Sequence, residues 1–105
     1  METAKLTGAA LDWAVAQCKG FPVRNGFDDN CPEYSTKWAE GGPIIEQEGI
    51  SINSHLDGYE WFARDYWGLN EQAAETPLVA AMRCYVANKL GDTVEVPDEL
   101  LNLEL

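Results

Sequence analysis

The chain has 105 residues, 46% of them hydrophobic, and a formal net charge of −11 at pH 7. This length fits one modest core, and the apolar content with four tryptophans excludes wholesale disorder. The negative charge argues against nucleic-acid binding, in which lysine and arginine neutralise phosphates, and against anionic membrane surfaces.

Three further features indicate the compartment. No apolar run approaches the ~20 residues of a membrane span. The first residues also lack the basic-then-apolar pattern of a secretory signal. Three cysteines without a CxxC pair indicate free thiols in a reducing compartment. We therefore expect a cytoplasmic protein without a membrane segment.

The first predicted element is a helix over residues 7–20. Thr7 can cap it, apolar side chains recur at helical spacing, and Gly20 ends it. Residues 21–34 follow with prolines, a glycine and an acidic run that break both helical and strand periodicity. We expect a surface loop there, longer than most loops in a compact domain.

A second helical region follows in two pieces. Ser35 offers a cap, and residues 36–40 predict a short helical turn. Gly41 and Gly42 loosen the chain before Pro43 begins a helix that runs through Glu48. The sequence leaves two interpretations open: one kinked helix, or two helices with a gap.

The middle of the chain predicts a β-hairpin. Its arms are residues 50–56 and 59–66, joined by Asp57–Gly58, a dipeptide favoured in tight turns. Two strands alone are marginal, so the hairpin should lie on the helices. We expect residues 67–75 to be a connecting loop and residues 94–96 to add a short third strand.

Residues 76–91 predict the clearest helix. Thr76 can cap it, Pro77 falls at the first helical position, and Gly91 can close it. One face is large and apolar, whereas the opposite face consists of small residues, alanines above all. A helix of this kind needs cover on two sides, so we expect it to be central, between the hairpin and the first helix.

Together these elements predict a small single α+β domain over residues 1–105. Its three main helices should pack on a short antiparallel hairpin or a three-stranded sheet. Residues 92–105 form an acidic C-terminal tail, which its leucines could hold against the domain.

The chemistry-bearing residues form no convincing catalytic pattern. Cys18 and Arg24 have the C-x5-R spacing of cysteine phosphatases, but Cys18 lies at the end of a helix, where that phosphate loop does not occur. His55 is the only histidine, and it has no cysteine partner in a recognisable motif. His55 and the cysteines also lack the clustered spacing of a zinc site. We therefore expect no enzyme activity, no metal and no cofactor.

The candidate functional residues belong instead to a recognition surface. Aromatic side chains and arginine are enriched at interface hot spots, and an acidic loop could meet a basic partner. The candidates for partner binding are Trp38, Trp61, Arg64, Tyr66, Trp67, Asp28 and Asp29. The small face of the 76–91 helix offers a separate surface for a homodimer, provided that the first helix does not cover it.

Four blocks of the sequence, in order, resemble the NinX-like family of bacteriophage and prophage proteins. They are TGAALDWAVA (residues 7–16), STKWAEGGPIIEQEGI (35–50), TPLVAAMRCYVANKLG (76–91) and VEVPDEL (94–100). The order of elements is also similar to phage alpha-beta-alpha sandwich domains. The resemblance implies phage origin, expression in a bacterial cytoplasm and an accessory role, and it implies no catalytic residue.

The function that we expect is therefore a non-catalytic phage accessory protein that binds a host or phage protein during infection. One alternative is an inhibitor of a bacterial defence system whose acidic surface mimics DNA. A second alternative is a small-ligand or nucleotide-binding domain.

Overall fold

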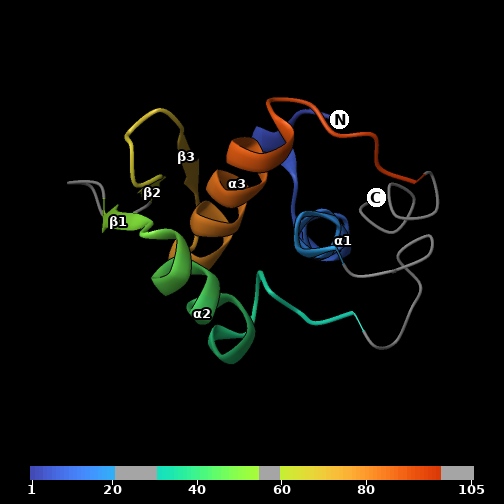
Figure 1. The fold of residues 1–105 in the computed structure, drawn as a ribbon, viewed down its shortest axis with the longest axis horizontal. Helices are drawn as coiled ribbons and strands as arrows, with labels where there is room; N and C mark the ends of the chain where they lie inside the picture. The colour runs from blue at the N-terminus through green and yellow to red at the C-terminus, as the bar shows by residue number, and fades with distance from the viewer. Residues whose placement is uncertain (21–30, 55–59, 98–105) are drawn as a thin grey trace.

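The structure is a computed structural model that describes residues 1–20, 31–54 and 60–97, and Figure 1 shows its fold. The elements are η1 (Thr3–Lys5), α1 (Gly8–Lys19), α2 (Trp38–Glu48), β1 (Ser51–Ser54), β2 (Trp61–Arg64), β3 (Glu71–Ala74) and α3 (Pro77–Leu90). Three helices with a three-stranded antiparallel sheet confirm the expected α+β class. Within the described ranges, no helix has both the length and the apolar character needed to cross a membrane.

Helix α3 is the centre of the fold. It starts as its sequence predicts: the Thr76 hydroxyl accepts a hydrogen bond from the Val79 amide at 3.2 Å, and Pro77 follows the cap. Eight of its residues, on both its large and its small face, are buried. It contacts all three strands as well as α1 and α2, and Figure 1 shows it between the sheet and α1.

The sheet has the strand order β1-β2-β3, with both pairs antiparallel. Its face toward the core presents Ala63 and Ala74, with Ile52 and Trp61 packed against the same core. Phe62 and Arg64 alternate with these residues and so belong to the opposite face. Among the described elements, α3 packs on the sheet and α1 packs on α3, so the layers differ from a sandwich with helices on both faces.

The third strand is β3, and the prediction of a plain loop over residues 67–75 was wrong. The sequence Glu-Gln-Ala-Ala has little intrinsic strand preference. Tertiary contacts stabilise the strand instead. β3 pairs along β2, and the Arg83 guanidinium donates to the Ala73 carbonyl at 2.7 Å. Residues 94–96, the predicted third strand, lie outside the sheet.

Helix α2 runs without a gap through Gly41, Gly42 and Pro43. Gly41 is buried where α2 meets α3, and a Cβ atom there would approach Leu78 Cδ1 to 2.7 Å. Only glycine fits at this close approach, and α2 continues through Pro43 although proline lacks a helical donor and its ring crowds the preceding turn. Lys37 takes the N-cap position that the sequence assigned to Ser35.

The two ends of the described chain meet beside the C-terminus of α3. Glu2 and Thr93 form an isolated antiparallel bridge, and the Thr3 amide donates to Asp92 O at 2.8 Å. The Thr3 hydroxyl donates to the Gly91 carbonyl at 2.7 Å. The beginning of the predicted acidic tail is thereby fastened to η1, whereas its leucines lie outside the described residues.

Candidate functional site

The turn between β2 and β3 presents three exposed apolar side chains. Tyr66, Trp67 and Leu69 are 70%, 75% and 80% exposed, more than any other large hydrophobic residue that the structure describes. The Tyr66 and Trp67 rings meet edge to face, with centroids 4.9 Å apart. We call these three residues the aromatic turn. Figure 1 shows it projecting from the sheet, away from α1.

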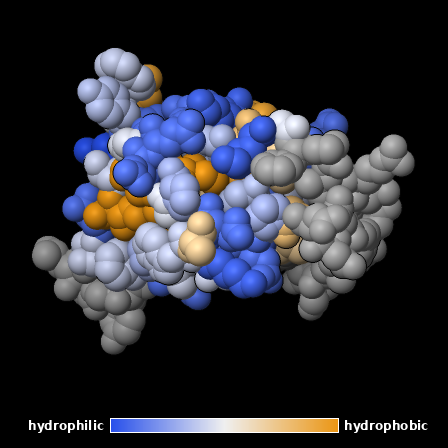
Figure 2. Space-filling model, turned by 60° about the horizontal axis from the view of Figure 1, so that its bottom comes forward, coloured by the Kyte–Doolittle hydropathy of each residue, from blue (hydrophilic) through white to orange (hydrophobic). Residues whose placement is uncertain are grey.

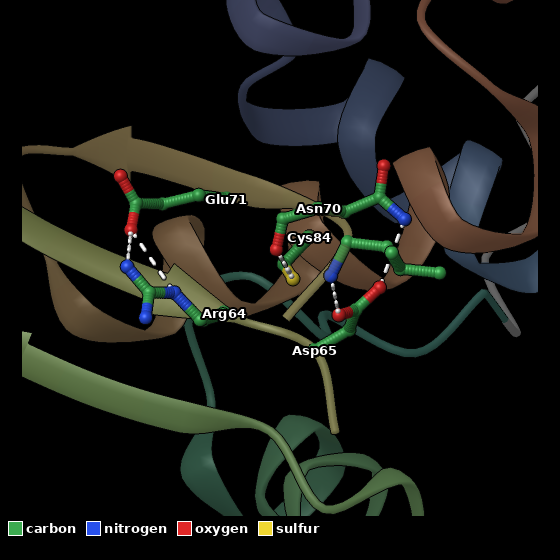
Figure 3. Close-up of polar contacts among 6 residues, drawn as sticks. Arg64, Asp65, Asn70, Glu71 and Cys84 are labelled. Atoms are coloured by element: carbon green, nitrogen blue, oxygen red, sulfur yellow. Dashed lines mark hydrogen bonds and ion pairs between the residues drawn. The ribbon is translucent and has the colours of Figure 1, made fainter. Parts of the chain in front are cut away.

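The buried side chain of Asp65 organises the backbone of this turn. Its Oδ1 accepts a hydrogen bond from the Leu69 amide at 2.8 Å, and its Oδ2 accepts one from the Asn70 side-chain amide at 2.9 Å (Figure 3). Burial alone would raise the pKa of Asp65, but hydrogen bonds from Asn70, Asn88 and the turn amides outweigh it and lower that pKa to about 2. The carboxylate is therefore charged at neutral pH.

Two contacts join the turn to α3. The Asn88 side-chain amide donates to Asp65 Oδ2 at 3.0 Å. The Cys84 thiol approaches the Asn70 carbonyl at 3.5 Å, as Figure 3 shows. Because these contacts reach α3, a helix buried on two faces, they restrain the backbone of the turn. Fixed loops lose less entropy when they bind, which favours recognition.

The end of α2 supports the turn from the other side. Gly49 has φ +66°, a left-handed conformation that closes the helix. A Cβ atom at Gly49 would lie 3.0 Å from Tyr66 Cδ2, so the Tyr66 ring packs directly on this glycine.

A small cavity of about 140 Å³ opens between the aromatic turn, α2 and α3. Two of its charged members form an ion pair, with Lys89 Nζ 3.3 Å from Glu48 Oε1, and the Asp65 carboxylate also lines it. Its lining includes Glu48, Ile50, Tyr66, Trp67, Tyr85 and Lys89. A partner side chain of modest size fits this volume better than a nucleotide does, because small-molecule sites usually exceed ~300 Å³.

Arg64 flanks the aromatic turn. Its Cδ lies 3.6 Å from the position that a Cβ atom on Gly68 would take, which places the stem of the side chain against the turn. Its guanidinium forms two hydrogen bonds with Glu71 Oε2, at 2.6 and 3.2 Å. This pair spans β2 and β3 on the outer face of the sheet (Figure 3).

The structure does not gather all the predicted aromatic residues into one patch. Trp38 is 54% exposed but lies at the start of α2, beside Pro77 at the start of α3. The aromatic turn lies instead beside the other ends of both helices. Trp61 is partly buried against the core. Sequence reasoning missed Leu69 and the role of Asp65, because the predicted strand over residues 59–66 ran past Arg64, where β2 ends. The turn signature Asp-x-x-Gly-x-Asn was thereby divided between that strand and the predicted loop.

Figure 2, which views the molecule from the α2 side, shows a surface that is mostly hydrophilic. The orange apolar areas in this view are small and separated from one another. The candidate residues Asp28 and Asp29 lie outside the described residues, so the acidic loop stays a prediction.

Burial determines the protonation state of two of the cysteine thiols. Burial raises the pKa of Cys18 to about 11, although nearby Lys89 opposes the shift. Burial, followed by the negative charges of Asp65 and Glu71, raises the pKa of Cys84 to about 12. Both thiols are thus protonated at neutral pH and poor nucleophiles. Arg24 and His55 lie outside the described residues. Among the residues that are described, no group of His, Cys, Asp or Glu is placed to hold a metal ion.

The small face of α3 is not available for a homodimer. Ala80, Ala81, Cys84 and Ala87 are all buried within the chain. The predicted homodimer surface required that the first helix leave this face uncovered. The structure shows the opposite, because α1 and the sheet pack around α3.

Comparison with known proteins assigns the chain to a family. No curated protein matches it. The family model described as Bacteriophage P22, NinX matches residues 2–89, a span that includes every helix and strand of the fold except the last residue of α3. The family resemblance of the sequence is confirmed over residues 2–89, and the chain belongs to the bacteriophage P22 NinX family.

Proposed function

We propose that the protein is a non-catalytic phage accessory protein that binds a host or phage protein in the bacterial cytoplasm through its aromatic turn. The observation that carries this proposal is the pairing of high exposure with a hydrogen-bonded turn backbone. Three of the most exposed apolar side chains lie on a turn that Asp65 and α3 hold in place.

An exposed tyrosine–tryptophan pair suits protein recognition. Tyrosine, tryptophan and arginine are the residue types that dominate binding energy at interfaces. Arg64 borders the turn, and the adjoining cavity can receive a side chain of the partner. Most of the apolar surface of Tyr66, Trp67 and Leu69 lies outside the core. This surface is therefore available to a partner.

A site-specific cross-link tests this proposal. A photoreactive benzoylphenylalanine at Leu69 should form an adduct with a discrete protein in infected cells. The same probe at the exposed Lys19, on α1, should not form that adduct. Trp67→Ala in the Leu69 probe protein should reduce the adduct by roughly thirtyfold, the scale of a ~2 kcal/mol hot spot.

The test also requires that Trp67→Ala keep the fold of the unchanged protein. Because Trp67 is 75% exposed, Trp67→Ala should alter the free energy of unfolding by under ~0.5 kcal/mol. If no adduct forms at Leu69, or if it forms equally without Trp67, the aromatic turn is not the binding surface.

Inhibition of a defence system through an acidic surface is the second candidate. The net charge of −11 favours it. Ion pairs also engage four basic side chains, Lys5, Lys37, Arg64 and Lys89, which leaves the surplus of carboxylates dominant. A basic nuclease that is captured from infected cells independently of Trp67, and released by double-stranded DNA, would favour this candidate over the first.

A further inference from the structure

The register of the sheet determines where the main-chain groups of β1 point. The Asp65 amide donates to Asn70 O at 3.1 Å, which makes these residues a hydrogen-bonded pair between β2 and β3. Such pairs alternate along an antiparallel ladder. Phe62 and Arg64 therefore turn their amides and carbonyls toward β1, where they face Asn53 and Ser51.

The same alternation turns the amides and carbonyls of Ile52 and Ser54 outward. β1 is an edge strand, so these groups point away from the sheet. Among the residues that the structure describes, none forms a backbone hydrogen bond with them beyond the ladder. The outer edge of β1 can thus pair with a further strand.

The opposite edge of the sheet is protected. The outward carbonyl of Ala73, on β3, accepts a hydrogen bond from Arg83 Nη1 at 2.7 Å. Arg83 Nε binds the Leu6 carbonyl at 2.8 Å, which ties the N-terminal segment alongside this edge. Proteins commonly guard edges by such cover, or by charges and prolines on the strand itself. β1, with the sequence Ser-Ile-Asn-Ser, has neither charge nor proline.

We propose that the β1 edge binds an extended, basic segment of the partner protein, which adds to the sheet as a fourth strand. Strand addition of this kind takes its affinity from main-chain hydrogen bonds. The inference rests on the proposed function and identifies the kind of partner segment. A basic segment is favoured over a second copy because each copy bears a net charge of −11.

The position of β1 also fits the aromatic turn. Gly49, against which Tyr66 packs, lies two residues before the start of β1. Ser51 is the register partner of Arg64, which flanks the turn. A strand that pairs along β1 therefore runs up to the aromatic turn at its Ser51 end, and a single partner can engage both.

Amide exchange with a defined peptide tests the inference. The probe is a short, blocked peptide of alternating lysine and valine, and the control is its glutamate–valine counterpart. The basic peptide should slow hydrogen exchange of the Ile52 and Ser54 amides by roughly tenfold or more. The Ser51 and Asn53 amides, already in the ladder, should change little. Equal protection by both peptides, or binding without protection at Ile52, overturns the proposal.

A proline at Ser54 provides the matched variant. Proline is tolerated at edge positions whose N–H points outward. Ser54→Pro should keep the melting temperature of the protein but remove the peptide-induced protection at Ile52, whereas Ser54→Ala should keep both. Asn53→Pro should lower the melting temperature, because the Asn53 amide belongs to the ladder. If Ser54→Pro does not fold, the hydrogen-exchange pattern of the unchanged protein with the two peptides still tests whether a strand pairs along β1.

Two results would assign the edge to other occupants and overturn the proposal. Protection of Ile52 that appears in the peptide-free protein as its concentration rises would indicate a second copy. Protection in the dilute, peptide-free protein would indicate that the chain covers its own edge. The Leu69 adduct separates the two proposals: if it depends on Trp67 but not on Ser54→Pro, the aromatic turn binds the partner and β1 does not. If the adduct is absent altogether, the proposed function itself fails.

Discussion

The carboxylate of Asp65, at the start of the turn after β2, accepts a hydrogen bond from the side chain of Asn88, which lies on α3, at 3.0 Å. This contact connects the display of Tyr66 and Trp67 to the helix at the centre of the protein. Stability at the core and presentation of the aromatic turn are therefore coupled through Asp65, as well as through the contact of Cys84 with Asn70.

Asp65→Ala should lower the free energy of unfolding by ~1–3 kcal/mol at pH 7, because the donors of Leu69, Asn70 and Asn88 lose a charged acceptor. Urea denaturation measures this loss. Glu71→Ala, which removes an exposed ion pair with Arg64, is the control and should cost under ~1 kcal/mol. Similar losses for both variants would contradict the role assigned to Asp65.

The same carboxylate predicts a pH dependence. The folded-state pKa of about 2 lies below the ordinary value of 3.8. The stability that this depression contributes is complete above about pH 4 and is lost as the pH falls through about 2. Asp65→Asn should therefore lose less stability than the unchanged protein between pH 5 and pH 2, as measured by urea midpoints. Parallel midpoint curves would show that Asp65 is not the source.

Gly49→Ala should destabilise the protein more than Gly20→Ala does. Both glycines have positive φ, +66° and +80°, so both substitutions introduce backbone strain on the order of 1 kcal/mol. Only at Gly49 does the new methyl group meet a side chain, that of Tyr66, at 3.0 Å, whereas nothing lies within 4 Å at Gly20. Thermal melts compare the two variants, and equal shifts would mean that Tyr66 does not pack on Gly49.

Gly41 and Gly42, adjacent in α2, should respond in opposite directions to alanine. Gly42→Ala should stabilise by ~0.5–1 kcal/mol, because alanine is the better helix former and the nearest side-chain atom is an ordinary 3.9 Å away. Gly41→Ala should destabilise by ~1–3 kcal/mol, because the methyl group would overlap Leu78 and the Tyr34 backbone. Chemical denaturation of both variants measures the contrast. A stabilising Gly41→Ala would show that α2 lies further from α3.

Arg83→Met should cost ~2–4 kcal/mol, because two carbonyls, those of Leu6 and Ala73, lose a charged donor near the protected sheet edge. Arg64→Met is the matched control and should cost under ~1 kcal/mol, since its ion pair with Glu71 is exposed. The urea midpoints of the two variants give the comparison. If the two costs are equal, Arg83 does not hold the β3 edge.

Local signals in the sequence predicted α3 well. Thr76, Pro77 and Gly91 each act within one helical turn, and the structure places all three at the ends of α3. The helix over residues 7–20 and the two strands of the hairpin were also found, since their periodicity lies within a few neighbouring residues.

What the sequence did not predict depends on contacts between distant residues. β3 exists because β2 and Arg83 bind a segment of low strand propensity. Gly41 is helical because Leu78 and Tyr34 enclose it. The aromatic candidates were chosen by residue type alone, and only the tertiary fold separates Trp38 from Tyr66 and directs Trp61 toward the core.

The bridge between Glu2 and Thr93 closes nearly the whole chain into a single loop. Closing so long a loop costs more chain entropy than closing a short one, because that cost grows with the logarithm of loop length. The bridge should therefore form after α3 has docked on the sheet, and it should be the first region to open in the native protein. Its opening would free the Gly91 end of α3 without disturbing the Asp65 contact one turn earlier, so the aromatic turn would stay in place while the two chain ends separate.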